Sequence, residues 1–457
     1  MSRHPTTGSG HGRGTPARRV AGRRRRAGWL LVGTLLGAAS GAVRADVALA
    51  NRKVDIEYWG GMAVDSGAAT LSRLTLAPSA RLLLGERWRA DLALRAEYAE
   101  DDTGLGTLDT YSHAARPIVD GDHFRVEVDR ATLTRRIGAG ALIVGKQTVP
   151  WGVLDGVQIT DRFDAVRRRD FVLTDVRPER LARWGVRWQG YLGGTNVDAA
   201  VLADPTVSQL AGLGDVFSPL APRLRGGLPP DAPALPVVVA DRDAYRGDAT
   251  LGLRLKRRFG SVEASVLTLR GPDTDPALRL VGTGAGPAVL LDYPERHLLG
   301  TTLEGPLGQA IWRLEAAYVP DQPVNVYGAE PLTVVERRRW LVGGGLDVNA
   351  PGGWFVNAQL AVDQIERGRL DPTRPHRDVV GTLRLQRGFR QDTVQLRAEL
   401  LGTLSDGDGV VRPVVEWRGH SHLRLELGGD LLFGERDELF GQYRDASRIW
   451  VRVRFSL

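Results

Sequence analysis

The chain has 457 residues and no cysteine, which leaves room for one large barrel or several domains and excludes disulfide bonds and thiolate chemistry. Its formal net charge of +7 arises at the N-terminus, because residues 1–45 hold nine of the 61 basic side chains and no acidic one. The rest of the chain has 52 basic and 54 acidic side chains, so its charge gives no reason to expect a nucleic-acid partner.

Residues 1–45 have the pattern of an export signal. Four consecutive arginines, 23–26, are followed by an apolar run over 29–43 and by a small-x-small sequence that ends at Ala45. We therefore expect a signal peptide over 1–45 and a mature chain over 46–457. The alternative is a signal anchor kept in the inner membrane, which requires a longer apolar run.

From residue 54 onward, apolar residues alternate with charged or polar residues in one segment after another. Side chains on a strand change face at every residue, so each such segment has one apolar and one polar face. The clearest segments are 54–58, 88–98, 124–129, 183–189, 251–256, 312–318, 354–363, 394–400, 423–431 and 448–457. Since no helical period competes with this alternation, we predict an all-β fold.

The connections between these segments alternate in length. Short, glycine-rich joins separate longer connections, which lie at 101–121, 149–181, 205–246, 271–293, 320–332, 367–375 and 434–445. The pattern predicts a transmembrane antiparallel β-barrel of about eighteen strands, with short periplasmic turns and longer extracellular loops. A soluble sandwich has no reason to keep all short turns on one side.

Aromatic residues form two sets at the ends of the predicted strands, on the apolar face. One set lies beside the short turns (Trp88, Trp312, Trp354 and Trp417) and the other beside the long loops (Tyr98, Phe124, Trp184, Tyr318, Trp340 and Phe433). Outer-membrane barrels carry such girdles where the wall meets the lipid headgroups. We therefore predict the outer membrane of a Gram-negative-type cell, with lipid around the wall and the barrel-assembly machinery as a partner during insertion.

The polar face, predicted to line the interior, is rich in arginine. Its candidate pore-lining residues are Arg254, Lys256, Arg313, Arg339, Arg384, Arg424, Arg448, Arg452 and Arg454. A guanidinium offers a planar fork of donors that suits carboxylate or phosphate, so these residues could guide an anion. The alternative is structural: arginines pair with acidic residues on neighbouring strands and stiffen the wall.

The connection 149–181 is the most distinctive segment. Gly145-Lys146-Gln147, Trp151-Gly152, Thr160-Asp161 and Arg169-Asp170-Phe171 occur in this order. This series resembles the alginate-export-like family of outer-membrane barrels and related porins. The resemblance implies an eighteen-stranded barrel that passes an anionic polysaccharide such as alginate, or other small solutes. It also implies that 149–181 folds inward as a constriction loop, with candidate residues Trp151, Asp155, Asp161, Asp164, Arg169 and Asp170.

Enzymatic chemistry has little support in the sequence. His420 and His422 are the only histidines close together and fall beside a turn, and the aspartates of 155–175 lack the spacing of a calcium loop. We expect no catalytic residues, no metal and no cofactor. The sequence predicts a passive channel for small anionic solutes or an anionic polysaccharide. A non-conducting structural or adhesive barrel is the alternative, followed by a barrel hydrolase.

Overall fold

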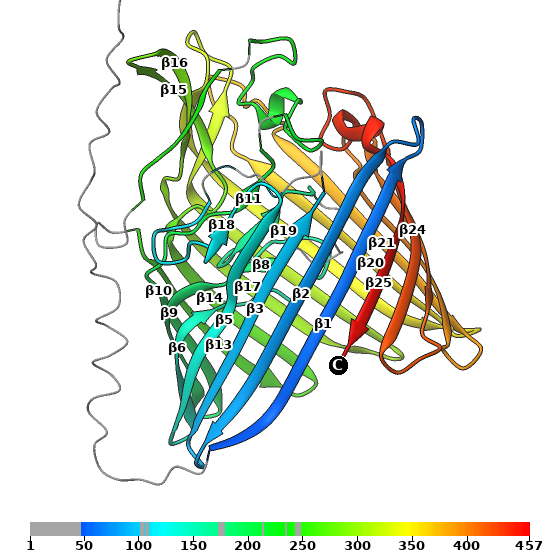
Figure 1. Ribbon diagram of the computed structural model, residues 1–457. Helices are drawn as coiled ribbons and strands as arrows, with labels where there is room; N and C mark the ends of the chain where they lie inside the picture. Colours follow the sequence, from blue (N-terminus) through cyan, green and yellow to red (C-terminus); the bar gives the residue numbers. More distant parts are fainter. Residues whose placement is uncertain are drawn as a thin grey trace, which may run out of the picture. The chain divides into compact units, whose positions relative to one another are not determined.

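The computed structural model describes residues 47–457 apart from 101–104, 106–107, 109, 172–178, 213, 234 and 243–247. The predicted signal peptide lies outside the described residues. Eighteen strands form one closed antiparallel barrel, in which each strand pairs with the barrel strands before and after it and β25 pairs with β1 (Figure 1). The predicted fold class and strand number are confirmed.

The strands of the wall are long, as a tilted barrel that spans a membrane requires. They are β1 (Val47–Ala63), β2 (Ala69–Leu84), β3 (Trp88–Ala99), β5 (Phe124–Ile137), β6 (Gly140–Gln147), β9 (Arg183–Leu192), β10 (Thr195–Leu202), β13 (Thr250–Phe259), β14 (Val262–Pro272), β17 (Glu295–Leu307), β18 (Ala310–Val326), β19 (Thr333–Ala350), β20 (Trp354–Ile365), β21 (Arg377–Phe389), β22 (Val394–Thr403), β23 (Asp408–Trp417), β24 (Leu423–Phe433) and β25 (Arg448–Ser456).

Smaller elements lie in the long loops. They are β4 (Val119–Asp120), which pairs with β5; β7 (Ala165–Arg168), β8 (Arg180–Leu181) and β11 (Gln209–Leu210), which form one small sheet; β12 (Val237–Val239), β15 (Ala277–Thr283) and β16 (Gly286–Asp292), which form another; and the 3-10 helices η2 (Pro222–Leu224) and η4 (Gly441–Ala446). No helix in the described ranges is both long and apolar enough to cross a membrane.

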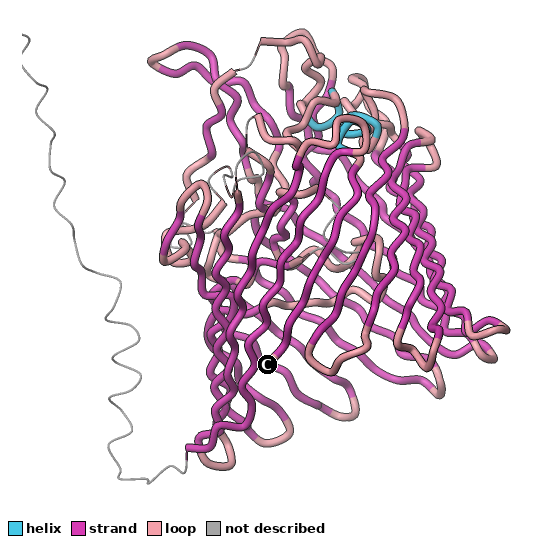
Figure 2. The backbone as a smooth tube through the Cα atoms, turned by 45° about the vertical axis from the view of Figure 1, so that its right-hand side comes forward, coloured by secondary structure: helices cyan, strands magenta, loops and turns pink. Residues whose placement is uncertain are grey.

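The short turns lie at one end of the barrel and the long loops at the other, as the alternating spacing predicts (Figure 2). One predicted loop is shorter than expected. The sequence suggests a connection over 320–332, but β18 continues to Val326 after a bulge between Val319 and Gln322. Pro320 lies within this bulge, where a strand tolerates proline, and the strand pairing resumes beyond it.

The two faces of the wall differ as the alternation predicts. Leucines and valines on the outer face are exposed, among them Leu92, Val266, Leu314, Leu360 and Val451. A closed sheet satisfies its backbone hydrogen bonds within itself, and an apolar outer surface suits a hydrocarbon surrounding. The barrel therefore has the surface of a wall that spans a membrane.

The predicted aromatic girdles are largely at the surface. Trp88, Tyr98, Phe124 and Trp340 are among the exposed large hydrophobic residues. Trp184 differs, because it packs against Tyr111 and Ala115 of the β3–β5 loop, and its Nε1 donates a hydrogen bond to the carbonyl of Ala114 at 2.9 Å. Its ring is therefore partly covered by protein.

Candidate functional site

The first half of the long β6–β9 loop, residues 149–165, lies against the inner wall of the barrel. Its buried apolar residues Val149, Trp151, Leu154, Ile159 and Phe163 pack in one cluster with apolar residues of the wall. These wall residues come from β10, β14, β17, β18, β19 and β20: Ala200, Leu202, Leu267, Leu269, Leu298, Ala317, Val319, Leu341 and Ala361. Without the loop, this apolar patch would face the interior of the barrel, so burial holds the loop to the wall.

Glycines on the inner face make room for this segment. A Cβ at Gly252 on β13 would lie 2.2 Å from Phe163 Cε2 and 2.6 Å from Trp151 Cη2, and one at Gly343 on β19 would lie 2.6 Å from Ile159 Cδ1. Gaps below 3 Å leave no space for a side chain. The glycines of these strands are therefore matched to the apolar side chains of the loop.

Glu315 on β18 anchors the backbone of the segment. One carboxylate oxygen accepts hydrogen bonds from the amides of Val153 and Leu154, the latter at 2.7 Å. The other oxygen accepts the Thr160 amide at 2.9 Å and the Thr160 hydroxyl at 2.6 Å. Only 2% of the Glu315 surface is exposed, so its charge is stabilised by the loop rather than by water.

Two predicted constriction residues stabilise the loop itself. Asp164 Oδ2 accepts the Val149 amide at 2.6 Å, and Asp161 Oδ1 accepts the Trp151 amide at 3.2 Å. Burial raises the pKa of the Asp164 carboxyl to about 7. Trp151, also predicted at the constriction, is buried, and its Nε1 donates to Asp198 on β10 at 3.0 Å. Asp155 lies half-buried near the tip of the segment.

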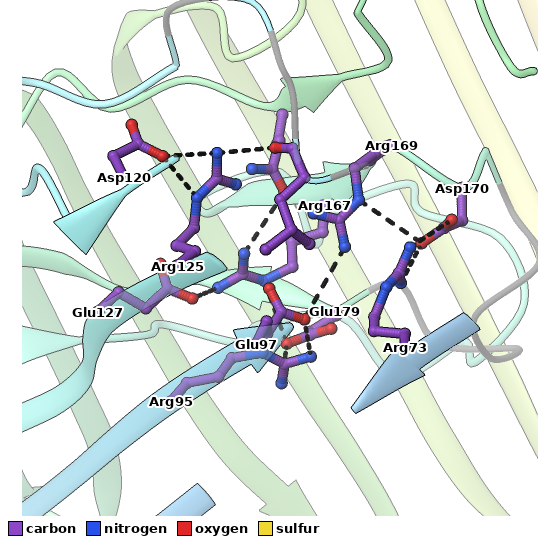
Figure 3. Close-up of polar contacts among 12 residues, drawn as sticks. Arg73, Arg95, Glu97, Asp120, Arg125, Glu127, Arg167, Arg169, Asp170 and Glu179 are labelled. Atoms are coloured by element: carbon purple, nitrogen blue, oxygen red, sulfur yellow. Dashed lines mark hydrogen bonds and ion pairs between the residues drawn. The ribbon is translucent and has the colours of Figure 1, made fainter. Parts of the chain in front are cut away.

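The second half of the loop, of which the structure describes residues 166–171 and 179–181, approaches another part of the wall, formed by β1, β2, β3, β5 and β25. Arg73 on β2 holds Asp170 through two hydrogen bonds of 2.7 and 3.0 Å, and Arg167 pairs with Glu127 on β5 (Figure 3). Burial opposes ionisation of Asp170, but the Arg73 charge outweighs it and lowers the Asp170 pKa below its usual range. Arg169 lies beside this pair, and burial followed by the Arg73 charge lowers its pKa to about 10.

A polar cavity of about 310 Å³ lies between this second half and strands β1, β2, β3 and β25. Six arginines and three carboxylates line it, together with Trp59, Thr75 and Gln209. The charged residues are Arg73, Arg95, Arg167, Arg169, Arg452 and Arg454, and Glu57, Asp170 and Glu179. The lining therefore holds more arginines than carboxylates, although Glu97, Glu127 and Glu426 pair with Arg95, Arg167 and Arg452 from just behind it.

Most of the predicted pore-lining cations are paired with carboxylates of neighbouring strands. Arg254 pairs with Asp198, Lys256 with Glu263, Arg313 with Asp347 and Glu304, Arg339 with Asp363, Arg384 with Glu399, Arg448 with Asp430, Arg452 with Glu426 and Glu57, and Arg454 with Glu57. Arg424 is exposed near the short-turn end of β24. Only Arg452 and Arg454 of this set line the cavity, so the predicted residues do not meet at one place.

Sequence reasoning missed several residues of the interior. Glu315, Arg73 and Arg95 fall on the inner face of predicted strands, but nothing in the alternation distinguishes them from other inward residues. Inward glycines such as Gly252 and Gly343 carried a usable signal, since a strand position without a side chain often marks a close approach by another segment.

Comparisons with known proteins agree with the barrel. Neither protein-family models nor curated proteins match this sequence. Among solved structures, OccAB3 of Acinetobacter baumannii is similar over 90% of this chain and 99% of its own, with 10% identity and a TM-score of 0.50. A BenF-like porin from Pseudomonas fluorescens Pf-5 has 10% identity over 90% of this chain and 98% of its own, with a TM-score of 0.47.

At these identities the similarity concerns the fold alone. The similarity to OccAB3 agrees with the wall of this barrel, which is closed, antiparallel, eighteen-stranded and apolar on its outer face. Such walls are found in bacterial outer membranes, where no backbone edge is left open to lipid. The chain is thus an outer-membrane β-barrel with the fold of the porins.

Proposed function

We propose that this barrel is a passive channel that favours small anionic solutes. The observation that carries the proposal is the cavity beside the β6–β9 loop, where six arginines face three carboxylates. Guanidinium groups can replace part of the hydration shell of an anion, and nearby acids keep its binding weak enough for release. Segment 149–165 occupies space along β10 to β20 and acts as the constriction, so a solute passes between it and the arginine-lined wall.

Two classes of solute are candidates for this channel: small anions and an anionic polysaccharide. The order of motifs from Gly145 to Phe171 resembles the alginate-export-like family, which favours an anionic polysaccharide as a second candidate. The cation pairs along the wall favour small solutes instead, because most inward arginines already contact a carboxylate. The non-conducting barrel and the barrel hydrolase stay as alternatives.

A planar-bilayer recording tests this proposal. We expect discrete conductance steps and, under a salt gradient, a reversal potential that shows a preference for chloride over potassium. Replacing Arg452 and Arg454 by glutamine should bring the permeability ratio towards unity, because both line the cavity. Arg87→Gln, in the exposed turn between β2 and β3, is the matched control and should keep the wild-type ratio.

Two outcomes would count against the proposal. Folded barrels that give no conductance steps would favour the non-conducting alternative. An anion preference that persists in the Arg452 and Arg454 variants would show that these arginines only stiffen the wall.

A further inference from the structure

We propose that the arginine-lined cavity is a discrete binding site for one small anion that carries two or three negative charges. The inference rests on the proposed function, because the ligand reaches the cavity through the interior of the barrel. It goes further in that it assigns a saturable site and a charge class, whereas a general anion preference requires neither.

The charge and size of the cavity set the class of ligand. Six arginines line it, from β2, β3, β25 and the β6–β9 loop, and Glu97, Glu127 and Glu426 pair with three of them from behind the lining. A compact ligand with two or three anionic groups can contact more than one of these arginines at once, which a ligand with a single anionic group cannot. The volume of about 310 Å³ lies at the small end of the range of about 300–1,000 Å³ for ligand pockets. That space suits a compact anion rather than a stretch of polysaccharide.

Arg169 has donors to spare. Its side chain is 7% exposed, and its closest carboxylates in the described part of the chain are Glu97 at 3.8 Å and Asp170 at 3.9 Å, beyond hydrogen-bonding distance. Among the described residues, Nε and Nη1 of Arg169 have no hydrogen-bond partner. A buried guanidinium left in this state costs free energy, which a bound oxyanion would recover.

The neighbouring carboxylates are engaged elsewhere. Asp170 is held by both Nη atoms of Arg73, at 2.7 and 3.0 Å, and Glu97 accepts a hydrogen bond from Arg95 at 2.9 Å. Glu179 pairs with Arg95 at 2.9 Å and with Arg167 at 3.1 Å (Figure 3). One of these carboxylates could pair closely with Arg169 only by giving up its present contact. Hydrogen-bond donors of Arg169 are therefore left without an acceptor.

Ring contacts hold the floor of the cavity in place. Trp59 lines the cavity, and its Nε1 is buried without an acceptor in the part of the chain that the structure describes. The Arg452 guanidinium lies 4.0 Å from the centre of the Trp59 ring, and Trp450 packs edge-on against the same ring with centroids 5.9 Å apart. These contacts fix the orientation of the floor, so little ordering is needed on binding.

The shared chemistry of the ligand is several anionic oxygens on a compact skeleton, which polycarboxylates and phosphates both offer. Isothermal titration of the folded barrel in detergent distinguishes these sources with three probes: propane-1,2,3-tricarboxylate, inorganic pyrophosphate and acetate. We expect tricarboxylate, pyrophosphate or both to bind with one site per barrel, and acetate to bind far more weakly. The probe that binds more tightly identifies the chemical source.

Variants at Arg169 test the site itself. R169Q should weaken binding of the tighter probe by about tenfold or more, the loss expected for a charge-assisted hydrogen bond. R87Q removes the same charge from the exposed β2–β3 turn and should bind as the wild type does. R169K keeps the charge but has fewer donors, so it should bind with intermediate affinity, and it provides the test if R169Q does not give a folded, heat-modifiable barrel.

The proposal is overturned if neither multivalent probe binds saturably, if acetate binds equally well, or if the Arg169 variants bind as tightly as the wild type. Its failure can be told apart from that of the proposed function. If the barrel conducts anions but does not bind the probes, the channel proposal stands and the binding-site proposal fails. If the barrel binds the probes but gives no conductance, the binding-site proposal stands and the channel proposal fails.

Discussion

Replacing Glu315 by alanine is expected to release segment 149–165 from the wall and to raise the single-channel conductance severalfold. The carboxylate accepts three backbone amides, of Val153, Leu154 and Thr160, and the Thr160 hydroxyl. Each such bond contributes about 1 kcal/mol, and each donor left buried without an acceptor costs about 1–3 kcal/mol. The loss of four acceptor contacts at once offsets part of the apolar burial that holds the segment, so residues 153–160 should move away from β18 and the proposed constriction should widen. Planar-bilayer recording measures the result.

The matched control is Glu304→Ala. Glu304 also carries an inward carboxylate, on β17, but its ion pair is with Arg313 of the wall at 3.7 Å and not with the loop. Its loss should leave the step size close to that of the wild type. If Glu315→Ala folds and its steps are no larger than those of the control, segment 149–165 does not limit the flow.

The second large effect is on stability, at Asp430. This carboxylate is fully buried on β24 and accepts hydrogen bonds from Arg412 at 2.9 Å and from Arg448 at 2.7 Å. Asp430→Ala removes the anion that lies between two buried guanidinium groups, and breaking a buried pair in this way costs about 3–5 kcal/mol. Unfolding in guanidinium chloride, with the barrel in lipid vesicles, should show a free energy of unfolding lower by that amount.

Two further variants check the cause of this loss. Replacing Asp430 by leucine together with Arg448 by methionine removes Asp430 and one of its two partners. Arg412 keeps its ion pair with Glu399 at 3.6 Å, so the double variant should recover part of the stability. Asp445→Ala breaks an exposed pair with Arg436 in the β24–β25 loop, with both side chains 61% exposed, and should cost less than about 1 kcal/mol. Equal losses for Asp430→Ala and Asp445→Ala would mean that burial does not govern these ion pairs.

The sequence predicts the wall well because one local rule governs it. In β25, Arg448, Arg452 and Arg454 point inward while Val451 points outward, and the same two-residue period recurs in the other barrel strands. The rule is lost where the β6–β9 loop covers an apolar inner face, as at Leu267 and Leu341, and where the chain departs from a regular strand. At Pro320, a bulge interrupts the alternation, and the sequence then resembles a loop although the strand continues.

The interior is harder to predict because its contacts join residues far apart in the chain. Arg73 and Asp170 are 97 positions apart, and Val153 and Glu315 are 162 positions apart. Alternation places Arg73 and Glu315 on the inner face, but the path of the β6–β9 loop decides which carboxylate it meets. The apolar side of that loop was also hidden, since Trp151 and Phe163 stand among aspartates and arginines that suggest a solvated segment.

Cysteine accessibility tests most directly whether this wall is a membrane-embedded pore with an aqueous interior. Because the chain has no cysteine of its own, a thiol reagent can modify only the cysteine introduced by a single substitution. In liposomes, a charged, water-soluble methanethiosulfonate should modify Arg454→Cys and Thr75→Cys, which line the cavity, and should lower the current through the same variants in a bilayer. Val451→Cys and Leu427→Cys, on the outer face, should stay unmodified. Modification of the outer pair, or protection of the inner pair in the folded barrel, would contradict the account.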